Sequence, residues 1–133
     1  MRKTLTWLAG IALLLLAGHT ADAGFKSDPI TVFVNESSKE AGGQIGAVRA
    51  SSDSTQWIVC TVDASDDIPN PGVICSVSTA AGVYRSCVTT APKYLQPVSA
   101  LNNDSLVKFR WRSDGQCVLI SVSNGSYQQP KQP

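Results

Sequence analysis

The sequence predicts a small all-β fold: an antiparallel β-sandwich or meander with one short crossover helix and two disulfides. Short β-branched and apolar runs are separated by clusters of Gly, Pro, Asn and Asp along most of the chain, which is the pattern of antiparallel strands joined by turns. Only one stretch has helical periodicity. Four cysteines follow an export signal, and an even number favours disulfides in a small exported domain.

The first 23 residues of the 133-residue chain have the three parts of a removable signal peptide. Arg2 and Lys3 precede an apolar run over residues 5–17, and Ala21-Asp22-Ala23 supplies a small-residue cleavage site. The run is shorter than the roughly 20 residues of a spanning helix. We therefore expect an exported protein, periplasmic or secreted, that does not span the membrane. Residues 24–127 would form a single β domain, and residues 128–133 a disordered tail without apolar groups to bury.

The composition excludes several classes of function. Signal cleavage removes His19, the only histidine, so Ser-His-Asp and Cys-His catalysis and histidine-ligated metals are excluded. The remaining chain has as many acidic as basic residues, and a balanced charge gives no long-range field to attract nucleic acid. We expect no enzymatic activity, no cofactor and no nucleic-acid partner. A carboxylate-dependent hydrolase is the alternative among enzymes.

Two strands separated by a long polar segment are predicted in the first half of the domain. Residues 30–34 are β-branched and apolar and follow a proline, as expected of a strand. Residues 35–55 are rich in Ser, Gly and charge, and the Gly-Gly-Gln-Ile-Gly run at 42–46 predicts a turn or bulge, because neither a lysine nor a helix supports a phosphate-binding loop. Residues 56–63 are apolar on both alternating faces, which predicts a central strand.

A hairpin is predicted where residues 73–79 and 83–89 flank Ala80-Ala81-Gly82, since the glycine can adopt positive φ. This register places Cys75 opposite Cys87, and opposed Cβ atoms lie about 4.5–5.5 Å apart, near the spacing of a disulfide. The first predicted bridge is therefore Cys75–Cys87, which leaves Cys60–Cys117 as the second. A hairpin centred on residues 66–72 would instead bring Cys60 opposite Cys75, and the sequence alone does not decide between them. Zinc is disfavoured because the cysteines are widely spaced and no histidine remains.

Residues 91–101 are the predicted crossover helix. Thr90 can cap it, Pro92 fits its first turn, and Pro97 keeps it short or kinked. One side carries the apolar residues Tyr94, Leu95, Val98 and Leu101.

The last predicted hairpin joins residues 105–112 to residues 116–122 through a two-residue Asp114-Gly115 turn. Its register pairs apolar residues on one face, namely Val107 with Val122, Phe109 with Ile120 and Trp111 with Val118. The other face carries the basic ladder, which we define as Lys108, Arg110 and Arg112, beside Cys117. A one-residue slip would bury three cations, so the register is expected to be firm.

The run Gly46-Ala-Val-Arg-Ala-Ser-Ser-Asp-Ser-Thr-Gln-Trp-Ile-Val-Cys60, the spaced cysteines at 75, 87 and 117, and the closing Ser121-Val-Ser-Asn-Gly-Ser-Tyr127 resemble a group of short exported bacterial proteins of uncharacterised function. The resemblance implies a bacterial source and a disulfide-bonded β fold. It carries over no activity and no site residue.

These observations favour an exported, disulfide-stabilised binding module with an extracellular or envelope ligand, which can be a glycan, another envelope component or a protein. The basic ladder, Lys108, Arg110 and Arg112, is the candidate ligand-binding site, because three cations on one strand face can meet carboxylates or phosphates. Calcium at Asp63, Asp66 and Asp67 is disfavoured, since the spaced ligands of a calcium loop are missing. The alternatives are a protease inhibitor acting through the loop at 67–72 and a surface-assembly protein; the sequence leaves the oligomeric state open.

The mature chain is predicted to start at Gly24. N-terminal sequencing of exported protein tests this, and recovery of the intact apolar run would contradict it.

Overall fold

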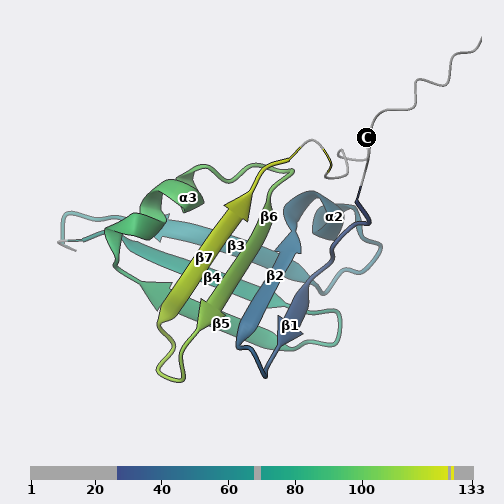
Figure 1. Cartoon of the computed structure of the whole chain (residues 1–133), viewed down its shortest axis with the longest axis horizontal. Coiled ribbons are helices and arrows are strands. Elements are labelled where there is room, and N and C mark those ends of the chain that lie inside the picture. The colour runs from purple at the N-terminus through teal and green to yellow at the C-terminus, as the bar shows by residue number, and fades with distance from the viewer. Residues whose placement is uncertain (1–26, 68–69, 126, 128–133) are drawn as a thin grey trace, which may run out of the picture.

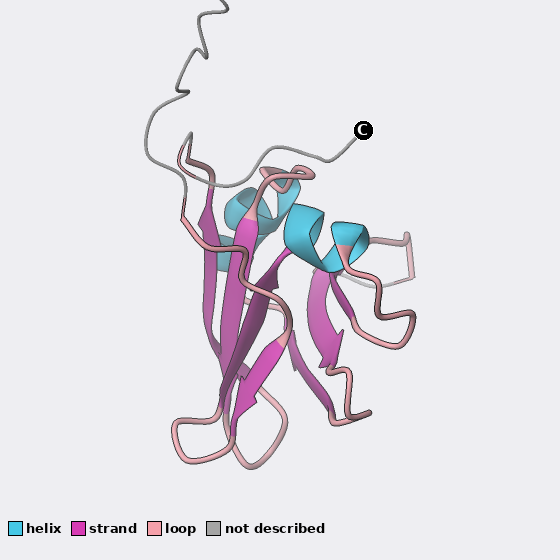
Figure 2. Cartoon of the chain, turned by 90° about the vertical axis from the view of Figure 1, so that its right-hand side faces the viewer, coloured by secondary structure: helices cyan, strands magenta, loops and turns pink. Residues whose placement is uncertain are grey.

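The computed structural model describes residues 27–67, 70–125 and 127, so the predicted signal peptide and tail lie outside the described residues. Two antiparallel sheets pack face to face, and the strands of one cross those of the other (Figure 1). The helices lie at one end of the pair of sheets (Figure 2). The predicted all-β class, with two disulfides and a short crossover helix, is confirmed.

The chain visits the first sheet, then the second, and then returns. In the order β1-β2-β6-β7, the four-stranded sheet contains β1 (Phe33–Asn35), β2 (Glu40–Gln44), β6 (Leu106–Trp111) and β7 (Cys117–Ser123). In the order β3-β4-β5, the three-stranded sheet contains β3 (Trp57–Asp63), β4 (Gly72–Ser78) and β5 (Tyr84–Thr89). Helix α2 (Ile45–Ala50) leads from β2 to β3, and η1 (Pro92–Tyr94) with α3 (Leu95–Ser99) leads from β5 back to β6.

The core lies between the inner faces of the two sheets. Val73, Cys75 and Val77 alternate along β4 and are buried, as the period of two along a strand requires. Phe109 of β6 is buried opposite them. The crossover helix closes one end of this core with its apolar side, as predicted, through Tyr94, Val98, Leu95 and Leu101. The predicted Thr90 cap is wrong, because Ala91 is the N-cap residue and no side chain caps the helix; Thr89 instead accepts a hydrogen bond from the N–H of Ala91.

The prediction of a turn or bulge over residues 42–46 is also wrong, since this run ends β2 and begins α2. The glycines serve a close approach of backbones. A Cβ at Gly42 would meet the carbonyl oxygen of Val107 in β6, and one at Gly43 would lie 3.3 Å from the carbonyl oxygen of Thr31. Glycine within a strand marks such an approach as well as it marks a turn.

Strand β3 is an edge strand rather than the predicted central one. It pairs only with β4, which occupies the centre of the three-stranded sheet. The apolar residues on both faces of β3 gave the wrong prediction, because one set packs on the core while Trp57 and Val59 are exposed.

The cysteine pairs differ from the predicted Cys75–Cys87 and Cys60–Cys117. The disulfides are Cys60–Cys75 and Cys87–Cys117. The predicted register of the β4–β5 hairpin is nevertheless correct, since Cys75 lies opposite Cys87. Cys75 also lies opposite Cys60, on the other neighbouring strand. The alternative left open by the sequence is therefore the one observed.

The hydrogen-bond pattern of β4 decides between the two partners of Cys75. At the turn, the N–H of Thr79 donates to the carbonyl of Val83, and Gly82 has φ +76°. In an antiparallel ladder, residues 73, 75 and 77 then bond to β5, and residues 74, 76 and 78 bond to β3. Cys75 and Cys60 form the non-hydrogen-bonded pair, in which side chains are closer, and their Cα atoms are 4.1 Å apart. Because Cys75 bonds to Cys60, Cys87 bonds to a cysteine of another strand.

A β-bulge between Arg110 and Trp111 brings Cys117 into position to bond to Cys87. The predicted register holds up to Arg110, which pairs with Leu119, but Trp111 then pairs with Cys117 instead of Val118. The shift turns Cys117 from the predicted outer face into the core, where it bonds to Cys87 of the other sheet.

The turn of this hairpin explains the bulge. The N–H of Arg112 donates to the carbonyl of Gln116, and the N–H of Gly115 donates to that of Arg112. The loop therefore has three residues rather than the predicted two, with Gly115 at φ +81°. Trp111, beside the bulge, is half-buried rather than buried, whereas Phe109 is buried as predicted.

The disulfides stabilise the fold to different degrees. Replacing Cys87 and Cys117 with alanine should cost about 3–4 kcal/mol of unfolding free energy, and replacing Cys60 and Cys75 roughly 0.6 kcal/mol less, because the loops span 30 and 15 residues. Chemical denaturation of both double variants measures this. Peptide mapping without reduction is the control, and a Cys75–Cys87 peptide would contradict the assignment.

Candidate functional site

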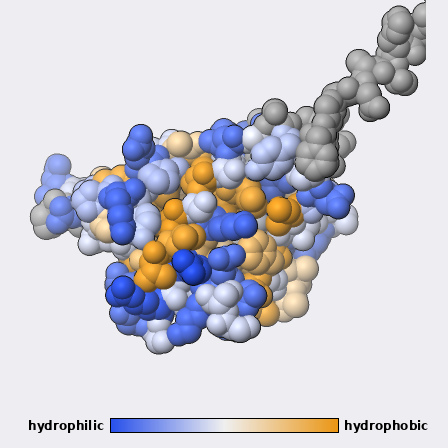
Figure 3. Space-filling model, in the orientation of Figure 1, coloured by the Kyte–Doolittle hydropathy of each residue, from blue (hydrophilic) through white to orange (hydrophobic). Residues whose placement is uncertain are grey.

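Lys108 and Arg110 of the basic ladder lie on the outer face of the four-stranded sheet, as predicted, whereas Arg112 follows the end of β6 and begins the turn to β7. Arg110 and Arg112 are exposed and Lys108 is half-buried. None of the three forms an ion pair with another residue of the described part of the chain. Figure 3 shows this face as apolar areas broken by strongly hydrophilic side chains. The ladder is therefore a solvated surface that remains free for a ligand, and nothing in its surroundings selects one.

A more distinctive surface lies on the opposite side of the molecule, on the outside of the three-stranded sheet. We define the outer apolar face as Trp57, Val59, Tyr84 and Val88, whose side chains are 42%, 41%, 52% and 41% exposed. Strand alternation and the sheet register place all four on one side, because Trp57 and Val59 face away from the core residues of β3 and pair through β4 with Tyr84 and Ser86. Exposed apolar side chains gathered on one face are typical of interaction sites.

Serine hydroxyls form the floor between these apolar side chains. Ser76 and Ser86 share a hydrogen bond of 2.8 Å, and the Tyr84 hydroxyl lies 3.5 Å from the Ser76 hydroxyl. These hydroxyls, first that of Ser76 and then that of Ser86, hold the pKa of the Tyr84 phenol below its ordinary value by stabilising the phenolate. The Trp57 and Tyr84 rings are 5.9 Å apart and tilted by 50°. The face thus offers aromatic contact area around a few hydroxyl groups.

The free edge of β3 borders this face. Since residues 74, 76 and 78 of β4 bond to Thr61, Val59 and Trp57, the N–H and C=O groups of Ile58, Cys60 and Val62 point away from the sheet. These outward groups have no hydrogen-bond partner within the described chain.

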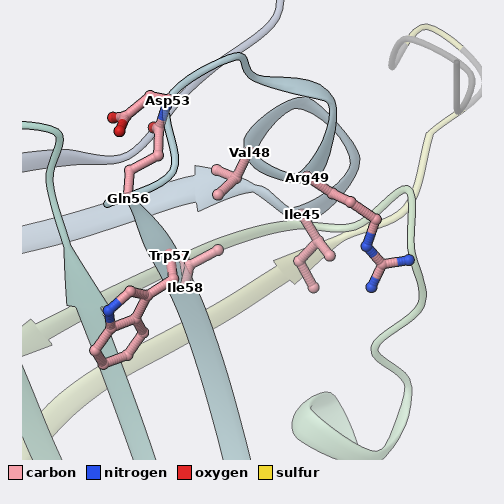
Figure 4. A pocket seen from close by; sticks show the side chains of 7 residues that line it. All are labelled: Ile45, Val48, Arg49, Asp53, Gln56, Trp57 and Ile58. Carbon is pink, nitrogen blue, oxygen red and sulfur yellow. The ribbon is translucent and has the colours of Figure 1, made fainter.

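Two adjoining cavities lie along this edge, beside α2 and the segment that follows α3. The larger, of about 320 Å³, is lined by Ile45, Val48, Arg49, Asp53, Gln56, Trp57 and Ile58 (Figure 4). The second, of about 230 Å³, shares Ile45, Arg49 and Ile58 with it and extends to Cys60 and residues 101–103. We call the two together the β3 groove. Figure 4 shows the Asp53 carboxylate and the Arg49 guanidinium at opposite ends of the larger cavity, with aliphatic side chains between them.

The charged groups of the groove differ in how they are held. Arg49 donates a hydrogen bond of 2.9 Å to the side-chain oxygen of Asn103. One oxygen of Asp53 accepts hydrogen bonds of 2.7 Å from the N–H and the hydroxyl of Thr55, whereas its other oxygen has no partner among the described residues. The side-chain and then the backbone hydrogen bond from Thr55 hold the pKa of Asp53 below its ordinary value of 3.8, so the group stays a carboxylate at neutral pH.

Two other candidates of the sequence receive no support from the geometry. In the part of the chain that the structure describes, no group of three or more His, Cys, Asp or Glu residues could hold a metal ion. The loop considered for a protease inhibitor, residues 67–72, includes Ile68 and Pro69, which lie outside the described residues.

Among the helices that are described, none is long and apolar enough to cross a membrane.

Comparison of the chain with protein-family models, with curated proteins and with solved structures finds no match. The resemblance to short exported bacterial proteins therefore stays an expectation from the sequence.

Asp53→Asn should lower the melting temperature at pH 7, because the carboxylate accepts the Thr55 hydrogen bonds more strongly than an amide does. Since the folded-state pKa lies below the ordinary value of 3.8, the stabilisation is complete above that value and is lost as the pH falls through the folded-state pKa. Thermal melts from pH 7 to pH 2 test this. Asp104→Asn is the control, since that exposed carboxylate accepts no hydrogen bond within the described chain. Equal melting temperatures for wild type and Asp53→Asn at pH 7 would contradict the assignment.

Proposed function

We propose that the protein is an exported binding module that recognises its ligand with the outer apolar face. The observation that carries the proposal is the exposure of Trp57, Val59, Tyr84 and Val88 together on one side of a disulfide-bonded sheet. Aromatic side chains exposed beside aliphatic ones supply most of the energy at many binding surfaces, because they exclude water over a large area at small entropic cost.

The scaffold supports this role. The Cys60–Cys75 disulfide joins β3 to β4 directly beneath the face, and a sheet held in this way loses little conformational freedom on binding. Two disulfides are also what an oxidising compartment outside the cytoplasm permits. The ligand is therefore an extracellular or envelope component with apolar surface.

The basic ladder is the competing surface, and one experiment compares the two. Mature protein is immobilised and exposed to envelope and culture-medium fractions of the producing organism, with wild type, Tyr84→Ala and Arg110→Glu in parallel. Because Tyr84 is the most exposed member of the face and Arg110 is exposed on the opposite sheet, neither change should unfold the protein.

Tyr84→Ala should weaken capture at least about tenfold, the scale of one aromatic contact at an interface. Arg110→Glu should leave capture within about twofold. Loss of capture by Arg110→Glu alone would overturn the proposal and assign recognition to the basic ladder. Thermal melts of all three proteins separate a lost contact from a lost fold.

A further inference from the structure

We propose that the free edge of β3 binds an extended peptide segment of a partner protein, which adds a fourth strand to the three-stranded sheet and places side chains in the β3 groove. This inference rests on the proposed function, since it names the kind of ligand that the outer apolar face and its border would take.

The first argument is that this edge is open and unprotected. Ile58, Cys60 and Val62 direct their N–H and C=O groups outward, and the pairing of β3 with β4 runs over all seven residues of β3 without a bulge. Soluble proteins usually protect such an edge with a lysine, a proline or a bulge. From Trp57 to Val62 the strand has none of these.

The other strand edges of the described chain are occupied or altered. On β5, the N–H of Val88 donates to the carbonyl of Gly115 in the β6–β7 turn, and the carbonyl of Tyr84 accepts from the Arg85 guanidinium, so both ends of this edge are engaged. Strand β1 has only three residues, and the β-bulge interrupts the pairing of β7. An extended segment therefore finds its longest regular template on β3.

The second argument is the position of the cavities. A strand added to β3 would direct alternate side chains to the two faces of the sheet. Those on the inner side would enter the β3 groove, while those on the outer side would extend the outer apolar face next to Trp57 and Val59. Main-chain hydrogen bonds for affinity and cavities for alternate side chains are the two elements of recognition by strand addition.

The cavities also distinguish a separate peptide from a second copy of this chain. If two β3 strands paired with each other, the side chains facing the groove would be Ile58, Cys60 and Val62 of the other copy. Ile58 and Cys60 already pack against their own core, and Cys60 is bonded to Cys75. Ile58 and Cys60 are therefore unable to fill the neighbour's cavities, whereas the side chains of an extended peptide are free to do so.

The lining of the larger cavity indicates the composition of the peptide. Val48 and Ile45 provide an aliphatic surface, and Asp53 lies at the end of the cavity with a carboxylate, one oxygen of which is buried without a partner in the described chain. A basic side chain with an aliphatic stem satisfies both features, because the stem packs on the apolar wall while the charge meets Asp53. We infer a segment with alternating apolar residues and one Lys or Arg facing this cavity.

The experiment pans a library of random ten-residue peptides, displayed on phage, against the mature disulfide-bonded protein. The selected peptides are synthesised, and their affinities are measured for wild type and for a matched pair of variants at Val62. Val62→Pro removes the outward N–H and leaves the bonds to β4 intact, since those come from the neighbouring residues. Val62→Ala removes the side chain but keeps the N–H.

Val62→Pro should weaken binding about tenfold or more, because a hydrogen bond is lost and the proline ring obstructs the added strand, while Val62→Ala stays within about threefold. The selected peptides should contain alternating apolar residues and a basic residue, and Asp53→Asn should weaken those with the basic residue. In wild type, bound peptide should slow amide exchange at Ile58, Cys60 and Val62, a readout that holds even if Val62→Pro folds poorly.

Two results would overturn the inference. One is that no peptide is selected above the background of uncoated beads. The other is that selected peptides bind Val62→Pro and Val62→Ala equally and leave the three amides unprotected. Tyr84→Ala keeps the two proposals separate, because its effect on capture of envelope components tests the outer apolar face whether or not the β3 edge binds a peptide.

Discussion

The alternation of hydrogen bonds along β4 determines most of what is distinctive in this protein. The three-residue turn closed by Thr79 and Val83 fixes which residues of β4 bond to β5 and which bond to β3. That alternation brings Cys60 and Cys75 into the close pair, and it points every second amide of β3 away from the sheet. The Cys60–Cys75 pairing and the choice of which β3 amides point outward thus both depend on this turn, which the positive φ of Gly82 permits.

The second disulfide, Cys87–Cys117, joins the two sheets. The two sheets share no main-chain pairing apart from the contact of Val88 with the β6–β7 turn, so the core side chains and Cys87–Cys117 hold them together. The bulge beside Trp111 makes this bond possible, because only the shifted register turns Cys117 inward. The exposed ion pair between Glu36 and Arg85 also spans the sheets, but a pair so open to solvent contributes at most about 1 kcal/mol.

The sequence predicts the parts of the fold that depend on local chemistry. The Ala-Ala-Gly turn, the register of Cys75 with Cys87, the crossover helix and the burial of Phe109 all follow from turn residues and alternation. The disulfides could not be predicted in the same way, because their choice depends on hydrogen-bond alternation and on a bulge that the Asp-Gly pair does not reveal. The turn predicted at Gly42 and Gly43 was wrong for a related reason, since the role of these glycines is close packing against another strand.

In the candidate site, too, the features set by local alternation could be predicted, and those set by the three-dimensional pairing of strands could not. The positions of Lys108 and Arg110 could be predicted because strand alternation alone places them on a solvent face. The outer apolar face could not, because Trp57 and Val59 look like core residues until the structure shows that nothing covers that side of β3 within the described chain. A strand that is apolar on both faces is compatible with a central position and with an exposed binding edge, and only the three-dimensional pairing separates them.

Residue-resolved amide exchange of the free protein tests the hydrogen-bond alternation most directly. The amides of Trp57, Val59 and Thr61 should exchange slowly because they bond to β4, while those of Ile58, Cys60 and Val62 should exchange at least about a hundredfold faster from the open edge. Uniform protection along all seven residues of β3, or protection of the opposite set, would contradict this alternation and the assignment of β3 as a free edge.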